Sequence, residues 1–167
     1  NLGAMLLKLR HTDAAAEALR RALALADHAS TRANLGMVYF IAKKFAEATE
    51  EYRRAVELEP DKAVHWGNLG DALTAQGHRE PALEAYRKAS SLAVAAVDRS
   101  PLDPSLHEER ALYCARSGDV ACALKEGQRA FDLQSDSAEI VFTNALIRCL
   151  AGKDDEGLDW LDRSVKL

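Results

Sequence analysis

The tripeptide Asn-Leu-Gly occurs three times, beginning at Asn1, Asn34 and Asn68, at intervals of 33 and then 34 residues. An asparagine amide donates and accepts hydrogen bonds at the same time, so it can pair with a peptide unit of any sequence. If the interval marks a structural repeat, the three amides stack along one face. The pattern therefore predicts a row of amide side chains that are able to pair with peptide units.

The other reactive side chains are not spaced for catalysis or for metal binding. The sequence contains no GxSxG, GxxxxGK(S/T), HExxH or GxGxxG motif, and its five histidines lack spaced partners. The acidic run from Asp154 to Glu156 lies at the start of an expected helix, where the helix dipole and capping explain it better than acid–base chemistry does. We expect no enzyme activity, no catalytic residue, no metal and no cofactor.

The three cysteines, Cys114, Cys122 and Cys149, form no metal-ligand spacing and are odd in number. We interpret them as small core residues in a reducing compartment rather than as redox groups, and we expect a cytoplasmic protein. The chain begins without methionine and part-way into a repeat. We therefore expect it to be a piece of a longer chain, and the sequence leaves a preceding signal peptide open.

Composition narrows the class of partner. The formal net charge is −4, and 48% of the residues are apolar, which is enough for a substantial core. Binding of a phosphate backbone requires clustered lysine and arginine, so we expect no nucleic-acid partner. No apolar stretch is long enough to span a bilayer, and we expect no membrane insertion.

The interval of about 34 residues corresponds to a pair of helices. Between 63 and 96, apolar and small residues recur at helical spacing until Gly77, which breaks the pattern. The helical spacing resumes from Arg79, with Pro81 in the first turn, where a missing N–H costs least. Residues 29–62 repeat this design. Because each helix is too short to be stable alone in water, we expect the pairs to pack on one another.

The spacing within both periods resembles the signature of the tetratricopeptide repeat, W-x2-L-G-x2-Y, then A-x3-F, then P. The matching residues are Leu35, Gly36, Tyr39, Ala48, Tyr52, Ala55 and Pro60 in the first period, and Trp66, Leu69, Gly70, Leu73, Ala82, Tyr86 and Ala89 in the second. Arg32 stands at the tryptophan position of the first period. Gly36 and Gly70 lie inside helices, where glycine costs about 1 kcal/mol relative to alanine, so we expect the paired helices to approach closely there.

The resemblance extends over the whole chain as a single solenoid, with weaker matches at both ends. We expect repeats at about 1–28 (partial, lacking the start of its first helix), 29–62, 63–96, 104–137 and 138–167. Arg110 and Asn144 occupy positions that hold leucine in the family. The second helix of the 63–96 repeat extends to about residue 103. This extension is either a tolerated insertion or a protruding contact surface.

The resemblance implies an all-α, right-handed superhelical solenoid whose first helices line a concave groove for a peptide or a partner protein. The residues expected in this groove are Asn34, Asn68, Met37, Phe40, Ile41, Asp71, Leu112, Phe142 and Leu146, with Leu150, Glu108 and Glu139 also on this face. The asparagines resemble the ladder that grips peptide backbones in O-GlcNAc transferase, but asparagine is also common at this position in the family. The apolar residues suit an amphipathic helix or a hydrophobic tail, unless the next repeat or missing segments cover them.

Other members of the family bind the acidic C-termini of chaperones through a clamp of lysine, arginine and asparagine. Of the five clamp positions only Asn68 matches, since Ala33, Met37, Ser105 and Glu109 stand at the others, and we expect no binding of such a tail. The alanine-rich composition resembles that of bacterial members, which are often fused to enzymes or regulators. We expect an interaction scaffold; a regulatory domain of a multidomain protein and a homo-oligomer formed through the solenoid ends are the alternatives.

Overall fold

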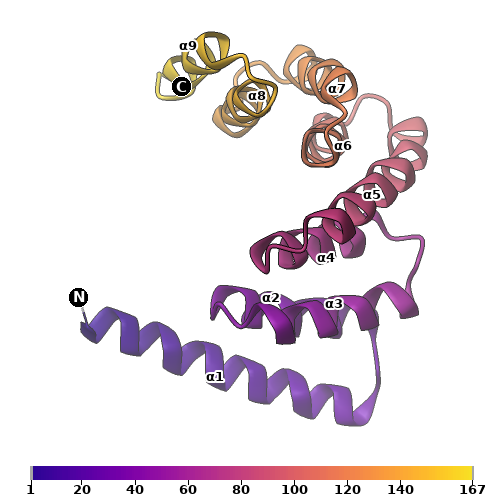
Figure 1. The fold of residues 1–167 in the computed structure, drawn as a ribbon, viewed down its shortest axis with the longest axis vertical. Helices are drawn as coiled ribbons and strands as arrows, with labels where there is room; N and C mark the ends of the chain where they lie inside the picture. Colours follow the sequence, from indigo (N-terminus) through magenta and orange to yellow (C-terminus); the bar gives the residue numbers. More distant parts are fainter. Residues whose placement is uncertain (1, 167) are drawn as a thin grey trace. The chain divides into compact units, whose positions relative to one another are not determined.

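The computed structural model describes the backbone of residues 2–166 and the side chains of residues 11–166. Within this range the chain consists of α-helices joined by short loops, without a strand (Figure 1). The helices are α1 (Leu2–Leu25), α2 (Ala29–Ile41), α3 (Phe45–Leu58), α4 (Ala63–Ala75), α5 (Arg79–Arg99), α6 (Pro104–Ser117), α7 (Val120–Leu133), α8 (Ala138–Leu150) and α9 (Asp154–Ser164). The expected all-α fold class is confirmed.

The chain divides into two compact units, Asn1–Ala85 and Tyr86–Leu167, and the boundary lies inside α5. In the first unit α2 packs against α3, and α1 packs against α2. In the second unit α6 packs against α7, and α8 packs against α9. Three of the expected helix pairs, α2–α3, α6–α7 and α8–α9, therefore form within the units.

A residue with left-handed backbone separates the two helices of each pair. These residues are Lys43 (φ 59°), Gly77 (79°), Gly118 (85°) and Gly152 (72°). Glycine adopts this conformation with little strain, and it ends a helix within one or two residues. A connection this short turns the chain back on itself, so the paired helices run antiparallel.

The beginning of the chain differs from the expectation. In the described backbone α1 is one unbroken helix, so the prediction of two helices within 1–28 is wrong. Arg10 stands 33 residues before Lys43, at the position of the left-handed residue, and no glycine or proline lies between it and Leu25. The predicted extension of the 63–96 repeat does occur, since α5 continues to Arg99.

Close packing explains a glycine inside α2. A Cβ built on Gly36 would lie 2.7 Å from Cε1 and 2.8 Å from Cδ1 of the Tyr52 ring in α3. Tyr52 itself is buried, as are Ala48 and Ala55 on the same helix. The predicted close approach of the paired helices at Gly36 is therefore confirmed, and alanine does not fit at this position unless the ring moves.

The two polar residues at leucine positions in the second unit are both paired. Asn144 is fully buried in α8 and donates from Nδ2 to the carbonyl oxygens of Gly127 (2.9 Å) and Ile140 (3.0 Å), while its Oδ1 accepts from Arg148 Nη1 (2.8 Å). Arg110 in α6 donates from Nη1 to Oε1 of the buried Glu126 (2.6 Å). Buried polar groups are tolerated when they find such partners. The whole Asn144 amide is paired in this way, whereas Nε of Arg110 is buried without a hydrogen-bond partner.

The interpretation of the cysteines as unbonded core residues is wrong. Cys114 in α6 and Cys122 in α7 form a disulfide, with their Cα atoms 5.7 Å apart. Cys114 is buried, as predicted, whereas Cys149 is exposed and is a free thiol. The disulfide joins the two helices of one pair across their connecting loop.

Candidate functional site

In the first unit, the exposed side of α2 carries three of the predicted residues. Asn34, Met37 and Ile41 are exposed and are spaced three and four residues apart, which places them on one face of the helix. Met37 and Ile41 keep 51% and 48% of their surface accessible. Phe40 is different: its ring packs edge-on against Phe45, with the centroids 5.3 Å apart. Phe40 thus contributes to the packing between α2 and α3.

Helix α4 lies against α2 and carries the other two predicted residues of this unit. Asn68 and Asp71 are both half-buried and one helical turn apart. Burial, and secondly the charge of Asp71, raises the pKa of Tyr52 to about 12, which shows that the Asp71 carboxylate acts on a core residue of the neighbouring pair. Asn1, the first member of the proposed asparagine ladder, lies outside the described residues.

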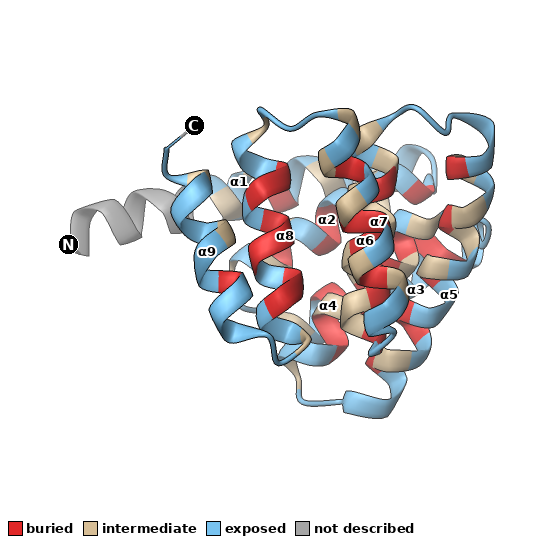
Figure 2. Cartoon of the chain, turned by 90° about the horizontal axis from the view of Figure 1, so that it is seen from above, coloured by how far each residue is buried: buried red, intermediate tan, exposed pale blue. Residues whose placement is uncertain are grey.

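In the second unit, α8 presents an apolar stripe. Phe142, Leu146 and Leu150 are separated by four residues each and have 53%, 38% and 55% of their surface exposed. The opposite side of α8 is buried, including Val141 and Ile147, and buried residues recur along this helix in Figure 2. The exposed leucines and phenylalanine therefore belong to a helix whose other face is already packed. Leu112, on the neighbouring α6, is half-buried.

Carboxylates border the apolar stripe of α8. Glu108 of α6 is half-buried and accepts a hydrogen bond from the Thr143 hydroxyl of α8 at 2.5 Å. The pKa of Glu108 is raised, mainly because the carboxyl is partly buried. The hydrogen bond from Thr143 lowers this pKa, and the negative charge of Glu139 raises it further. Glu108 and Glu139 therefore form a pair of like charges near the start of α8.

The predicted residues thus fall into two groups, one in each unit. The first consists of Asn34, Met37, Ile41, Asn68 and Asp71 on α2 and α4, and the second of Leu112, Phe142, Leu146, Leu150, Glu108 and Glu139 on α6 and α8. Phe40 belongs to neither group.

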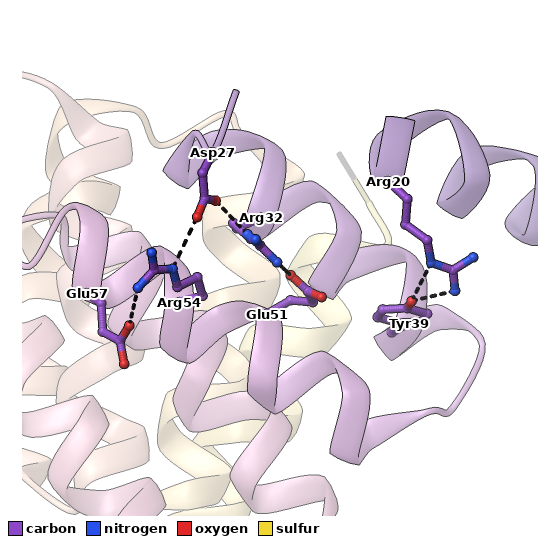
Figure 3. Close-up of polar contacts among 7 residues, drawn as sticks. All are labelled: Arg20, Asp27, Arg32, Tyr39, Glu51, Arg54 and Glu57. Carbon is purple, nitrogen blue, oxygen red and sulfur yellow. Dashed lines mark hydrogen bonds and ion pairs between the residues drawn. The ribbon is translucent and has the colours of Figure 1, made fainter. Parts of the chain in front are cut away.

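A network of ion pairs that the sequence did not predict holds α2 in place (Figure 3). Arg32 donates from Nε to Asp27 (2.7 Å) and from Nη1 to Glu51 of α3 (2.8 Å), and Arg54 of α3 donates to the second oxygen of Asp27 (3.2 Å). The hydrogen bond from Arg32 is the main cause that lowers the pKa of Asp27. Arg32 stands where the family has tryptophan, so an ion-pair network replaces an aromatic contact at the start of this helix.

The described part of the chain was also searched for metal sites and for helices that could span a membrane. Among these residues no group of three or more histidine, cysteine, aspartate or glutamate side chains is arranged to hold a metal ion. No helix within the described range has the length and apolar character needed to cross a membrane.

The family models and the named relatives all indicate the same family. Two models described as tetratricopeptide repeat match residues 27–93 and 68–138. The tetratricopeptide repeat-containing protein trd-1 of Caenorhabditis elegans is 26% identical over 93% of this chain, which spans only 20% of the length of that relative. The peroxisomal targeting signal receptor of Candida albicans is 30% identical over 38% of this chain, or 11% of the receptor.

A solved structure shows the same fold. The crystal structure of YrrB, described as a tetratricopeptide repeat protein with an unusual peptide-binding site, superposes with a TM-score of 0.58 at 17% sequence identity. The match covers 98% of this chain and 81% of YrrB. At this identity the likeness concerns the fold alone.

Proposed function

Because the chain belongs to the tetratricopeptide repeat family, we propose that it is a protein-interaction module that binds a peptide or a partner protein on the exposed faces of its first helices. The observation that carries this proposal is the apolar stripe of α8. Phe142, Leu146 and Leu150 are exposed in line on a helix whose other side is buried. Exposed apolar residues grouped in this way mark a surface that another molecule covers.

The relatives support this class of function. One of them is a receptor for a targeting signal, and YrrB has a peptide-binding site. In the family the concave groove lined by first helices is the usual binding surface. The first helices are α2 and α4 in the first unit, and α6 and α8 in the second. This chain corresponds to a fifth or less of the length of these longer proteins. Their activity as whole proteins is therefore not assigned to it. We also propose that the module itself is not catalytic, since its fold offers a surface rather than an enclosed pocket.

A specific observation favours self-association as a second candidate. Leu158, Leu161 and Val165, near the end of the described chain, have 60%, 39% and 81% of their surface exposed. Two copies could cover this face of α9 by packing together. Light scattering over a range of protein concentrations tests it: a constant monomer mass refutes self-association, and a mass that rises to the dimer and returns to the monomer in Leu158→Ser/Leu161→Ser supports it.

The location of the protein belongs to the same proposal. We expected a reducing, cytoplasmic location from the sequence. The Cys114–Cys122 disulfide argues against it, because disulfides persist chiefly in oxidising compartments. Whether Cys114 and Cys122 are bonded in cells therefore decides between a reducing and an oxidising compartment.

The proposed function is tested by selecting peptides from a random library displayed on phage against the whole chain. Peptides that bind the wild type and lose binding to Phe142→Ser/Leu146→Ser support it. Leu102→Ser is the matched control, because Leu102 is exposed (72%) but lies in the loop before α6. Selection of no peptide that distinguishes the stripe variant from the control contradicts the proposal for this face.

A further inference from the structure

The apolar stripe of α8 has the dimensions of a contact with another helix. Its three residues span nine positions, or about 12 Å at the rise of an α-helix. Helical peptides that bind to protein grooves present apolar anchors at i, i+3 or i+4, and i+7, which cover a similar length. The stripe is flanked by α6, on which Leu112 is half-buried, so an occupant would contact apolar atoms from two helices.

The charges at one end of the stripe are of a single sign. Glu139 lies three residues before Phe142 on α8, and its charge acts on Glu108 of α6, which is itself half-buried. The Thr143 hydroxyl donates to Oε1 of Glu108 and holds that carboxylate in place at 2.5 Å. Arg110, two residues after Glu108 on α6, pairs with Glu126 of α7 instead (2.6 Å). Glu108, held by Thr143, and the exposed Glu139 thus place two like charges at the start of the apolar stripe.

We propose that the face formed by α6 and α8 binds a cationic amphipathic helix. The apolar residues of this helix contact Phe142, Leu146 and Leu150, and a lysine or arginine near one end lies between Glu108 and Glu139. This inference rests on the proposed function and names its class of partner. A cation placed there relieves the repulsion between the carboxylates and forms charge-assisted hydrogen bonds at the edge of an apolar surface, where they are stronger than in open water.

Three synthetic peptides of equal length test the inference. Each carries the same leucine stripe, and the polar positions near one end hold lysine, glutamine or glutamate. Fluorescence anisotropy with the whole chain measures the dissociation constant of each. We expect the lysine peptide to bind at least about tenfold more tightly than the glutamate peptide, which corresponds to about 1.4 kcal/mol. The preference should decline with added salt, because part of the site is exposed.

Variants of the chain show which residues cause the preference for the lysine peptide. Glu108→Gln/Glu139→Gln should bind the three peptides with nearly equal affinity, since the apolar contacts remain and glutamine can still accept the Thr143 hydrogen bond. Phe142→Ser/Leu146→Ser should lose all three. The matched control is Asp132→Asn/Asp136→Asn, which changes the net charge equally at exposed positions outside α6 and α8 and should keep the preference. Circular dichroism confirms that each variant has the helix content of the wild type.

The outcomes separate this inference from the proposed function. If the glutamine or glutamate peptide binds as tightly as the lysine peptide and depends on Phe142, the cationic partner is wrong while the interaction module stands. If the preference survives in Glu108→Gln/Glu139→Gln, the carboxylate pair is not its cause and the inference fails. If no peptide binds and the phage selection is also negative, both proposals fail. A dimer that dissociates in Phe142→Ser/Leu146→Ser would show a second copy on this face and overturn the inference.

Discussion

The buried amide of Asn144 allows the most quantitative test of how the second unit is held together. Replacing it with alanine removes the hydrogen bond from Arg148 Nη1 (2.8 Å) and the bond to the Gly127 carbonyl (2.9 Å). A hydrogen bond to a charged group contributes about 1.5–3 kcal/mol and a neutral one about 1 kcal/mol. We expect the free energy of unfolding to fall by about 3 kcal/mol, or the melting temperature by roughly 6–12 °C.

Urea titration followed by circular dichroism measures this loss. Asn34→Ala is the matched control, because the same substitution at an exposed asparagine should change stability by less than about 0.5 kcal/mol. A double-mutant cycle with Arg148→Met then isolates the pair, and we expect a coupling of at least about 1 kcal/mol. If Asn144→Ala is no less stable than Asn34→Ala, or if the coupling is near zero, the claim that hydrogen bonding makes asparagine acceptable at this leucine position is refuted.

The remaining predictions concern other parts of the chain. Gly36→Ala should destabilise the fold by about 1–3 kcal/mol although alanine favours helices, because its Cβ would overlap the Tyr52 ring; a more stable variant in a urea titration would contradict this packing. Glu108→Gln should stabilise the fold at pH 7, because a carboxyl with a raised pKa in the folded state destabilises that state when ionised. The gain should shrink as the pH falls through the folded pKa and vanish below the unfolded pKa of about 4.3; an equal gain at pH 7 and pH 4 would refute the reasoning. Alkylation of the unreduced protein, read by mass spectrometry, should modify Cys149 alone, whereas labelling of all three cysteines would show that Cys114 and Cys122 are not bonded.

Much of the fold could be predicted because the repeat signature fixes which residues meet. Gly36 occupies a signature position, so a close approach of the paired helices there was expected, and the run of alanine and valine before Asp98 indicated the extended α5. The unbroken α1 could not be predicted from this position, because Lys43, which also carries a Cβ, adopts the left-handed conformation at the equivalent place in the next repeat. The Cys114–Cys122 disulfide could not be predicted from the sequence, because it depends on how α6 and α7 are rotated relative to one another.

The candidate site was predicted less completely than the fold. Helical periodicity places Met37, Ile41, Phe142 and Leu146 on outward faces, and the structure has them exposed. It does not indicate that Phe40 turns to pack on Phe45, which depends on a contact between helices. The consequences of Arg110 and Asn144 were hidden for the same reason: their partners, Glu126 and Gly127, lie on the neighbouring helix α7.

The central claim is that the outward face of α8 binds a partner polypeptide. It is tested most directly by the dissociation constant of one phage-selected peptide for the wild type, for Phe142→Ser/Leu146→Ser and for Leu102→Ser. Loss of two apolar contacts should weaken binding at least about tenfold in the stripe variant and leave the control unchanged. Equal affinity for all three proteins would contradict the claim, since binding would then depend on another surface of the chain.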